Sequence, residues 1–131
     1  MKEKWVIAIT IAAIMAVAAA YSIGNVSLES KSKKINALLI INFGNETWNF
    51  NVTLNNSATV YSLLMKGAEE NNFTVSTTYY PQYQSYFINS IAGVKNENGK
   101  YWQYWINCEY GEVSANLQKL KNGDVVEWKF I

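Results

Sequence analysis

The sequence predicts an α+β fold: a mixed β-sheet with one main helix packed on it, preceded by an N-terminal hydrophobic helix. Three observations predict this class. Residues 5–23 are almost entirely apolar, residues 60–68 repeat apolar side chains at helical spacing, and several later segments alternate as strands do. The chain is therefore expected to comprise a signal peptide or N-terminal membrane anchor (1–23), a polar tether (24–34) and one folded domain (35–131).

The first predicted element is the apolar run from Trp5 to Ile23, which follows the charged start Met1-Lys-Glu-Lys4. Such a start is typical of a secretory signal peptide or of a single membrane-spanning helix. Ala18-Ala-Ala20 fits a cleavage site, whereas the run is longer than a signal core of about 7–15 residues and just suffices to cross a bilayer. Lysines flank both ends of the run, so charge does not decide the orientation of an anchor. Together with the glycosylation triplets described below, the run predicts a domain outside the cytoplasm, either secreted or anchored at the cell surface through residues 5–23.

Two strands are predicted next. Residues 37–43 are apolar on both faces, which suits a central strand, and residues 44–47 predict a turn. Residues 48–54 alternate strictly, so one row of side chains faces the core and a row of Asn and Thr faces water. The inward row is Trp48, Phe50, Val52 and Leu54.

The helix has the clearest pattern. Thr59 is a suitable N-cap, and Asn71-Asn72 predicts the end of the helix. Apolar or small residues recur at helical spacing and are expected to face the sheet, whereas Lys66, Glu69 and Glu70 face water. The inward residues are Val60, Leu63, Leu64, Gly67 and Ala68.

The second half of the domain predicts further strands. Residues 73–79 form a strand with a Thr-rich outer face, followed by a loop over 79–87 that contains the chain's only Pro. Residues 88–94 and 100–107 are expected to pair as a hairpin across Asn98-Gly99, which is a strong hairpin signal. A short helical turn is predicted over 113–120, and residues 125–131 close the sheet.

Three segments of this half resemble a known family. They are Gly99–Asn107 with its Tyr-Trp-Gln-Tyr-Trp core, Gly123–Phe130, and Ile88–Val94. They are similar to the transcobalamin-like C-terminal domain family, and the resemblance extends over about residues 36–131. It implies a β-grasp-like domain found on secreted and surface proteins, and the strand and helix pattern predicts the same order independently. Relatives often have Asn-Gly where this chain has Asn107-Cys108, which puts the shape of that turn in question.

The resemblance also bears on the ligand. Family members in vitamin carriers supply one half of a cobalamin site, and a large helical barrel supplies the other half. This chain has no such barrel, so we expect no cofactor, and cobalamin binding by this chain alone is not expected. Binding of a cobalamin-type ligand together with another chain remains a minor alternative.

The composition argues against catalysis, metal binding and nucleic-acid binding. The chain has no His, all eleven of its basic residues are Lys, and its net charge is +1. The commonest general base near neutral pH is therefore missing, and one Cys without His cannot assemble a zinc site. The scattered charge also gives no basic patch for nucleic acid. We therefore expect a non-enzymatic protein with no metal site and no nucleic-acid partner.

Two single residues have structural interpretations. Asp124, the only Asp, follows Gly123 and is expected to bond nearby backbone amides in a turn. Cys108 cannot form an internal disulfide because it is the only Cys. Because Cys108 lies an even number of residues after Trp102 and Tyr104, it would be on the same face of an extended strand, and it is expected to point inward as a small apolar side chain.

The best candidate binding surface is aromatic. Side chains on the predicted strand 100–107 alternate between two faces, and the more apolar set should face the core. The other set is then an outward row of Tyr and Trp interleaved with amide side chains. Such a row is typical of a platform for sugars, flat rings or a protein partner, and the 79–87 loop would supply a second wall. The alternative is that the outward rings are covered and belong to the core. The candidate ligand-binding residues are Tyr101, Gln103, Trp105, Asn107, Tyr80, Tyr83 and Tyr86.

Five Asn residues begin Asn-x-Ser/Thr triplets without Pro, the acceptor pattern for N-glycosylation of exported chains. Because Asn, Ser and Thr are abundant, some of these triplets are expected by chance. Those at 45, 55 and 72 fall in predicted turns, and that at 51 falls on the outward face of a strand. The candidate acceptors are Asn25, Asn45, Asn51, Asn55 and Asn72.

Two functions follow from these observations. The first is an extracytoplasmic cell-surface module, tethered to the membrane, that binds an unknown small molecule, a glycan or a surface protein. The second is a structural or adhesive surface protein that self-assembles through sheet edges, for which the strand over 73–79 is the candidate edge.

Overall fold

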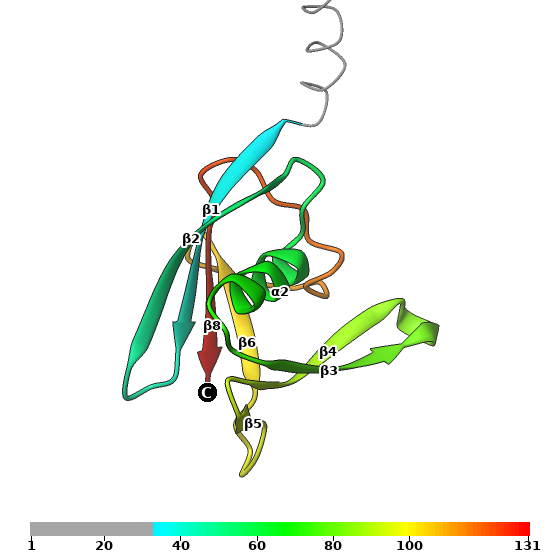
Figure 1. Cartoon of the computed structure of the whole chain (residues 1–131). Helices are drawn as coiled ribbons and strands as arrows, with labels where there is room; N and C mark the ends of the chain where they lie inside the picture. The colour runs from blue at the N-terminus through cyan, green and yellow to red at the C-terminus, as the bar shows by residue number, and fades with distance from the viewer. Residues whose placement is uncertain (1–32) are drawn as a thin grey trace, which may run out of the picture. The chain divides into compact units, whose positions relative to one another are not determined.

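The computed structural model describes residues 33–131 (Figure 1). The predicted signal peptide or anchor, residues 24–32 of the tether and the acceptor Asn25 lie outside the described residues. Within the described part of the chain, no helix has the length and apolar character needed to cross a membrane. The first described strand begins at Lys34, which the sequence assigned to the tether.

A five-stranded sheet forms the centre of the domain. Its strands are β1 (Lys34–Asn42), β2 (Thr47–Asn55), β6 (Trp102–Ile106), β7 (Glu109–Tyr110) and β8 (Val125–Phe130), in the order β2-β1-β8-β6-β7. β1 and β8 are parallel neighbours, and the other pairs are antiparallel. The first and last strands therefore lie side by side in the middle of the sheet, and β1 is central as its apolar sequence predicts.

One helix, α2 (Val60–Glu70), lies across this sheet (Figure 1). Thr59 is the N-cap, and its hydroxyl accepts a hydrogen bond from the Ser62 backbone N–H in a capping box. At the other end the Asn71 side chain donates to the Gly67 carbonyl. The predicted N-cap and inward stripe are confirmed, and the stripe is Val60, Leu63, Leu64, Gly67 and Ala68.

A second, three-stranded antiparallel sheet follows the helix. It contains β3 (Val75–Tyr80), β4 (Ser85–Ile91) and β5 (Val94–Lys95), with the short 3₁₀ helix η1 (Pro81–Tyr83) at the end of the β3–β4 hairpin. Figure 1 shows this hairpin projecting away from the five-stranded sheet. The predicted 79–87 loop is thus wrong in extent, because strand pairing continues as far as Tyr80 and Ser85.

The predicted pairing of 88–94 with 100–107 is also wrong. β4 pairs with β3 and with the two-residue β5, whereas β6 pairs with β7 and β8. Asn98 and Gly99 do form a tight turn with positive φ angles of 55° and 78°, but only one isolated bridge, between Glu97 and Lys100, closes it. The Asn-Gly signal therefore identified a turn correctly without identifying the strands on either side.

Of the short helical turn predicted over 113–120, the structure has one hydrogen-bonded turn, in which the Leu117 N–H donates to the Ser114 carbonyl. The segment also lies against the start of α2, where the Val60 and Tyr61 N–H groups donate to the carbonyls of Gln118 and Ala115. The first N–H groups of a helix have no partner within the helix. Two carbonyls of the 113–120 segment satisfy two of these N–H groups, which gives a physical reason for the irregular course of the segment.

The core lies between α2 and the inward face of the five-stranded sheet. It contains four side chains of β1, two of β2 and three of α2, together with two each from β4, β6 and β8. Those of the last three strands are Ile88, Ile91, Trp102, Tyr104, Val126 and Trp128. Trp48 and Phe50 also face inward but are only half-buried. Within residues 33–131 the predicted α+β class, with one main helix packed on a mixed sheet, is confirmed.

Candidate functional site

Strand β6 presents two different faces, as its alternation predicts. Trp102 and Tyr104 are 5% and 6% exposed and point into the core. Gln103 and Trp105 alternate with them on the opposite, outer face of the sheet and are only partly covered. Tyr101 lies just before the strand and is exposed.

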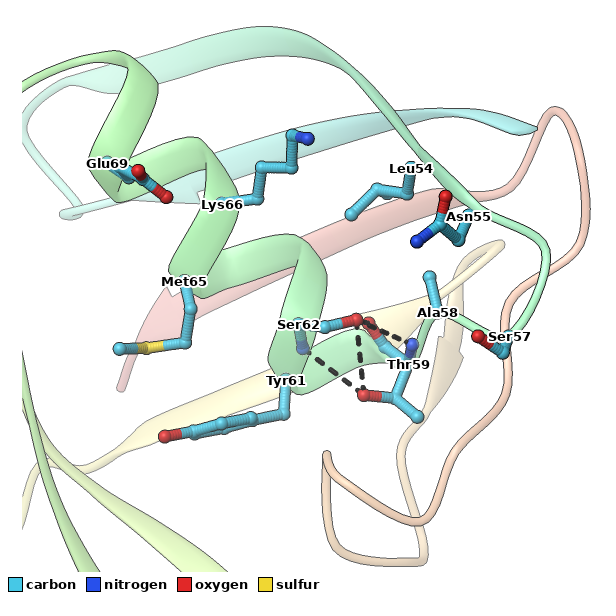
Figure 2. A pocket seen from close by; sticks show the side chains of 10 residues that line it. All are labelled: Leu54, Asn55, Ser57, Ala58, Thr59, Tyr61, Ser62, Met65, Lys66 and Glu69. Atoms are coloured by element: carbon cyan, nitrogen blue, oxygen red, sulfur yellow. Dashed lines mark hydrogen bonds between the residues drawn. The ribbon is translucent and has the colours of Figure 1, made fainter. Parts of the chain in front are cut away.

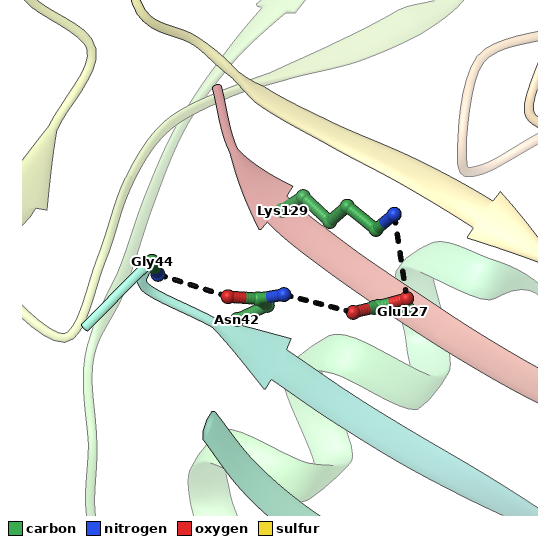
Figure 3. Close-up of polar contacts among 4 residues, drawn as sticks. All are labelled: Asn42, Gly44, Glu127 and Lys129. Atoms are coloured by element: carbon green, nitrogen blue, oxygen red, sulfur yellow. Dashed lines mark hydrogen bonds and ion pairs between the residues drawn. The ribbon is translucent and has the colours of Figure 1, made fainter. Parts of the chain in front are cut away.

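A line of polar contacts crosses the outer face (Figure 3). The Gly44 backbone N–H donates to Asn42 Oδ1 at 2.9 Å, and Asn42 Nδ2 donates to Glu127 Oε2 at 3.0 Å. Lys129 Nζ lies 3.8 Å from Glu127 Oε1. These contacts connect the end of β1 to β8.

The same line continues onto β6 and β7. Lys129 Nζ lies 4.5 Å from the centroid of the Trp105 ring, and the Tyr110 ring meets Trp105 edge-on at 5.3 Å. The Tyr110 hydroxyl donates to Gln103 Oε1 at 3.0 Å. The polar and aromatic groups of this face are thus already paired with one another, and a lysine covers part of the Trp105 ring.

Asn107 has a structural role. It lies in the turn between β6 and β7, where its Nδ2 donates to Asp124 Oδ1 and its Oδ1 accepts from the Val125 N–H. Asp124 Oδ2 also accepts from the Lys121 N–H, as its place in a turn predicts. The Asn107 amide is therefore occupied by the chain itself.

The prediction that Cys108 points inward is wrong. Cys108 is exposed and is the second residue of the β6–β7 turn, with φ of 68° after φ of 50° at Asn107. Parity holds only while the backbone stays extended, and here the strand has already ended at Ile106. Two successive positive φ angles are those of a type I′ hairpin turn, so this turn forms without Gly at its second position.

Among residues 33–131, the β3–β4 hairpin carries most of the exposed aromatic side chains. Residues 73–94 contain no charged side chain. Exposed rings cover both faces of the hairpin and its end, where Tyr83 is 70% exposed. The exposed aromatic residues, which we call the hairpin patch, are Tyr79, Tyr80, Tyr83, Tyr86 and Phe87.

Contacts with the rest of the domain hold this hairpin in place. The Tyr86 ring stacks on Tyr61 of α2 with a centroid distance of 4.5 Å, and Tyr79 packs against Tyr86 at 4.7 Å. The Asn116 side chain accepts from the Tyr86 N–H at 3.1 Å and donates to the Gln84 carbonyl at 2.9 Å. The hairpin is therefore held close to its turn by α2 and by Asn116, while its rings stay at least partly exposed to solvent.

The hairpin patch differs from the outer face because its tyrosine hydroxyls are not engaged in hydrogen bonds with other described residues. Among residues 33–131, none of its four tyrosine hydroxyls has a hydrogen-bond partner within the chain. The neighbouring loop adds two exposed apolar side chains, Val113 and Leu117. Rings next to free hydroxyls and apolar groups can stack on a ring-bearing ligand and donate hydrogen bonds to it.

The two predicted walls do not form one surface. Tyr86 contacts α2, whereas Gln103 and Trp105 lie on the sheet face opposite to the core and the helix. Tyr80, Tyr83 and Tyr86 are brought together with Tyr79 and Phe87, which the sequence reasoning did not select. The signal that could have found them is the absence of charge over residues 73–94.

Open grooves also lie on the surface of the part of the chain that the structure describes, among them the following three. The first, of about 630 Å³, runs between the end of β2 and α2 (Figure 2). Two of its hydroxyls, those of Thr59 and Ser62, are engaged in the capping box. A second, of about 430 Å³, is bordered by Phe43, Trp48 and Phe130, and a third, of about 600 Å³, by the loop after β7.

Burial raises the pKa of Tyr104 above its ordinary value, and the nearby Tyr110 adds to the effect. Within residues 33–131 no group of three or more His, Cys, Asp or Glu side chains lies together as metal ligands would.

Comparisons with known proteins identify the family. Residues 58–131 match the family model described as "Domain of unknown function (DUF4430)". The structure is similar to haptocorrin, solved in complex with Cbi, with a TM-score of 0.66 and 23% identity over 76% of this chain but only 25% of the haptocorrin chain. It is also similar to a "putative metal binding protein" from Ruminococcus gnavus ATCC 29149, with a TM-score of 0.54 and 16% identity over 74% of this chain and 96% of that chain.

These structural likenesses establish the fold, and no curated protein matches the sequence. The family model covers more than half of the chain, namely its helix and all the strands that follow. The resemblance to the transcobalamin-like C-terminal domain family is therefore confirmed, and the chain belongs to the DUF4430 family, which is found in transcobalamin-like proteins.

Proposed function

We propose that this protein is a non-enzymatic ligand-binding module with a β-grasp-like domain, and that the hairpin patch is its contact surface. The observation that carries the proposal is a fixed, charge-free hairpin that exposes five aromatic side chains. Large exposed apolar patches on soluble domains commonly mark binding sites. The ligand class that fits is a ring-bearing small molecule or glycan that stacks on tyrosine and accepts hydrogen bonds from its hydroxyl.

The hairpin patch is preferred to the outer face around Trp105 for a physical reason. A ligand at Trp105 would have to displace the Lys129 ammonium from the ring and break existing contacts of Tyr110 and Gln103. In the hairpin patch, Tyr86 and Tyr79 pack on neighbouring rings, whereas among residues 33–131 no ring or cation contacts the rings of Tyr80, Tyr83 and Phe87, so a ligand at these three would displace water. The predicted candidates Tyr80, Tyr83 and Tyr86 therefore remain in the proposed site, while Tyr101, Gln103, Trp105 and Asn107 form the competing surface.

We also propose that the domain works outside the cytoplasm, tethered to the cell surface by residues 5–23. The apolar run after a charged start supports this, as do the Asn-x-Ser/Thr triplets. The four candidate acceptors within residues 33–131 are all exposed, so none is buried away from a glycosylating enzyme. They are Asn45, Asn51, Asn55 and Asn72.

A cobalamin-type ligand fits only together with a second chain. The haptocorrin whose structure is similar was solved in complex with Cbi, and this chain covers 25% of it. An open hairpin patch encloses one side of a ligand, whereas pockets for small molecules bury most of the ligand surface. A partner that covers the other side would complete such a site.

Calorimetric titration of the full-length chain in nanodiscs with a panel of glycans and corrinoids tests the proposal. Tyr83→Ala should weaken binding by about 3- to 10-fold, because one stacked ring contributes about 0.5–1.5 kcal/mol. Tyr101→Ala is the matched control, since this ring is also exposed but lies beside the C-terminal end of β8. If Trp105→Ala removes binding while Tyr83→Ala leaves it intact, the outer face is the site; no response to any ligand contradicts small-molecule binding.

A further inference from the structure

We propose that the outer edge of β2 pairs with β2 of a second copy of this chain, so that two five-stranded sheets join into one. β2 is the terminal strand of its sheet and lies along the sheet margin in Figure 1. Apart from its ladder with β1, no backbone hydrogen bond among residues 33–131 involves residues 48–54. Alternate N–H and C=O groups of β2 therefore point outward, ready to bind another strand.

The strand lacks the features by which proteins usually protect a sheet edge. It pairs with β1 over nine consecutive residues without a register shift, and it contains no Pro. No charged side chain occurs between Glu46 and Lys66. Long, flat edges without charge, Pro or a bulge are the ones that add a further strand.

The edge of β3 is protected by comparison. The sequence pattern favoured residues 73–79 as the assembling edge, but β3 carries a register shift between Ser76 and Thr77 and is followed directly by Pro81. A bulge twists an edge away, and Pro cannot donate to a ladder. β2, with neither feature, is the edge open to pairing.

The side chains of β2 favour a second β2 as the occupant. Antiparallel pairing centred on Asn51 places Trp48 opposite Leu54 and Phe50 opposite Val52 of the second copy. Trp48 and Phe50 are half-buried at the free edge, so this register would cover them. Because the edge is uncharged, the best match in charge is an uncharged strand, and self-pairing sets no like charges opposite each other.

The same register makes a distance prediction. The two Asn51 residues face each other across the twofold axis, with Cα atoms about 4.5–5.5 Å apart as in any directly opposed antiparallel pair. Asn49 is opposite Thr53 of the second copy, so the two Asn49 residues are separated by about 13 Å along the strands. A disulfide can therefore join two cysteines at 51 but not two at 49.

Cysteine cross-linking of the full-length chain in nanodiscs that hold two copies tests this register. The chain is produced in a host without N-glycosylation and carries Cys108→Ser. Under mild oxidation Asn51→Cys should give a disulfide-linked dimer as the main product, whereas Asn49→Cys, equally exposed and on the same strand, should stay monomeric. A mixture of Asn49→Cys and Thr53→Cys chains should cross-link. Absence of the Asn51→Cys dimer, or equal cross-linking at 49, overturns the proposal.

Introducing charged side chains at the twofold axis between the two β2 strands gives an independent test. Asn51→Lys sets two ammonium groups opposite each other and should weaken dimerisation at least 10-fold by analytical ultracentrifugation in detergent. Asn49→Lys, which faces a neutral Thr53, should weaken it less. The thermal unfolding midpoint of each variant checks that the domain stays folded. A wild-type chain that stays monomeric at all concentrations, or equal weakening by both variants, would contradict the β2 pairing.

Discussion

Tyr104 connects three parts of the chain through one side chain. Its ring is buried, its hydroxyl donates to the Val113 carbonyl at 2.6 Å, and its backbone carbonyl accepts from the Gly111 N–H at 2.9 Å. Gly111 lies so close over the ring that a Cβ there would overlap three ring atoms. Tyr104 therefore fixes the path of the loop after β7. Position 111 requires Gly, because the backbone there lies against the Tyr104 ring and leaves no space for a Cβ atom.

Gly111→Ala should destabilise the domain by about 1–3 kcal/mol, the usual cost of forcing extra atoms into a packed site. The Tyr104 ring cannot move aside without breaking its hydrogen bond to Val113. Urea unfolding followed by Trp fluorescence measures the change. Glu112→Ala, at an exposed neighbouring position, should stay within about 0.5 kcal/mol of wild type; an equal loss in both variants would show that the loop tolerates no change.

The raised pKa of Tyr104 makes stability depend on alkaline pH. Its ordinary pKa is about 10.0, and burial raises it because the phenolate would lose its hydration. Above pH 10 the unfolded state then releases this proton more readily than the folded state, so stability decreases as pH rises. Below pH 10 the contribution of Tyr104 is complete.

Tyr104→Phe should remove this part of the alkaline loss. The variant loses the hydrogen bond to Val113 and should be less stable than wild type at pH 7. The difference between the two should stay constant up to about pH 9 and shrink above pH 10, as measured by urea unfolding at several pH values. A difference that remains constant up to pH 11 would contradict the assignment.

At the scale of the elements, α2 approaches the sheet closely at Gly67. A Cβ at this position would overlap the Leu39 side chain of β1, and Leu39 is fully buried. Gly is unfavourable inside a helix, so Gly67 is retained for packing rather than for helix formation. This close contact sets the spacing between the helix and the sheet.

Gly67→Ala therefore involves two opposing effects. Helix propensity would stabilise the domain by about 1 kcal/mol, whereas overpacking costs about 1–3 kcal/mol. Because Leu39 has no free space to move into, we expect net destabilisation by about 1 kcal/mol in chemical unfolding. Lys66→Ala, at an exposed position of the same helix, should change stability by less than 0.5 kcal/mol, and a stabilised Gly67→Ala would show that Leu39 can repack.

At the scale of the whole molecule, the ends of the folded part meet in the centre of one sheet. β8 lies between β1 and β6 and contributes Val126 and Trp128 to the core. Removal of β8 would expose two strand edges and leave the inward faces of β1 and β6 without their neighbour. The five-stranded sheet therefore cannot form until the last residues are present.

A chain that ends at Asp124 should show no cooperative unfolding transition in thermal circular dichroism. A chain that begins at Lys33 is the matched control, because it keeps every described strand and should melt as the full-length protein does. A cooperative transition in the chain without β8 would mean that the remaining strands form a core by themselves.

Much of this fold could be predicted because it depends on local order along the chain. The alternation of β2, the opposite faces of β6 and the cap and stripe of α2 depend on side chains a few residues apart. These patterns set the period of each element and the side that is buried. The same patterns predicted that Trp102 and Tyr104 face the core while Trp105 does not.

The candidate site was harder to predict, because its availability depends on contacts between distant segments. Tyr80, Tyr83 and Tyr86 were selected, but Asn116, which lies thirty residues beyond Tyr86, holds the hairpin on which they lie. Likewise Lys129 of β8 covers Trp105 of β6, a contact that no local pattern specifies. The alternation of side chains along a strand predicts on which face of the sheet an aromatic ring lies, but it does not predict which residues contact that ring.

By itself, the sequence determined the α+β class, the single described helix, the direction in which most strand residues point and the family. Periodicity carries this information, since each element buries the side on which its apolar residues recur. Only the tertiary structure decided that β4 pairs with β3 rather than β6, that the Ala115 and Gln118 carbonyls bind the first N–H groups of α2, and that Cys108 faces solvent. The physical reason is that strand partners and helix-end contacts are chosen among segments far apart in the chain, where the lowest free energy depends on the whole assembly.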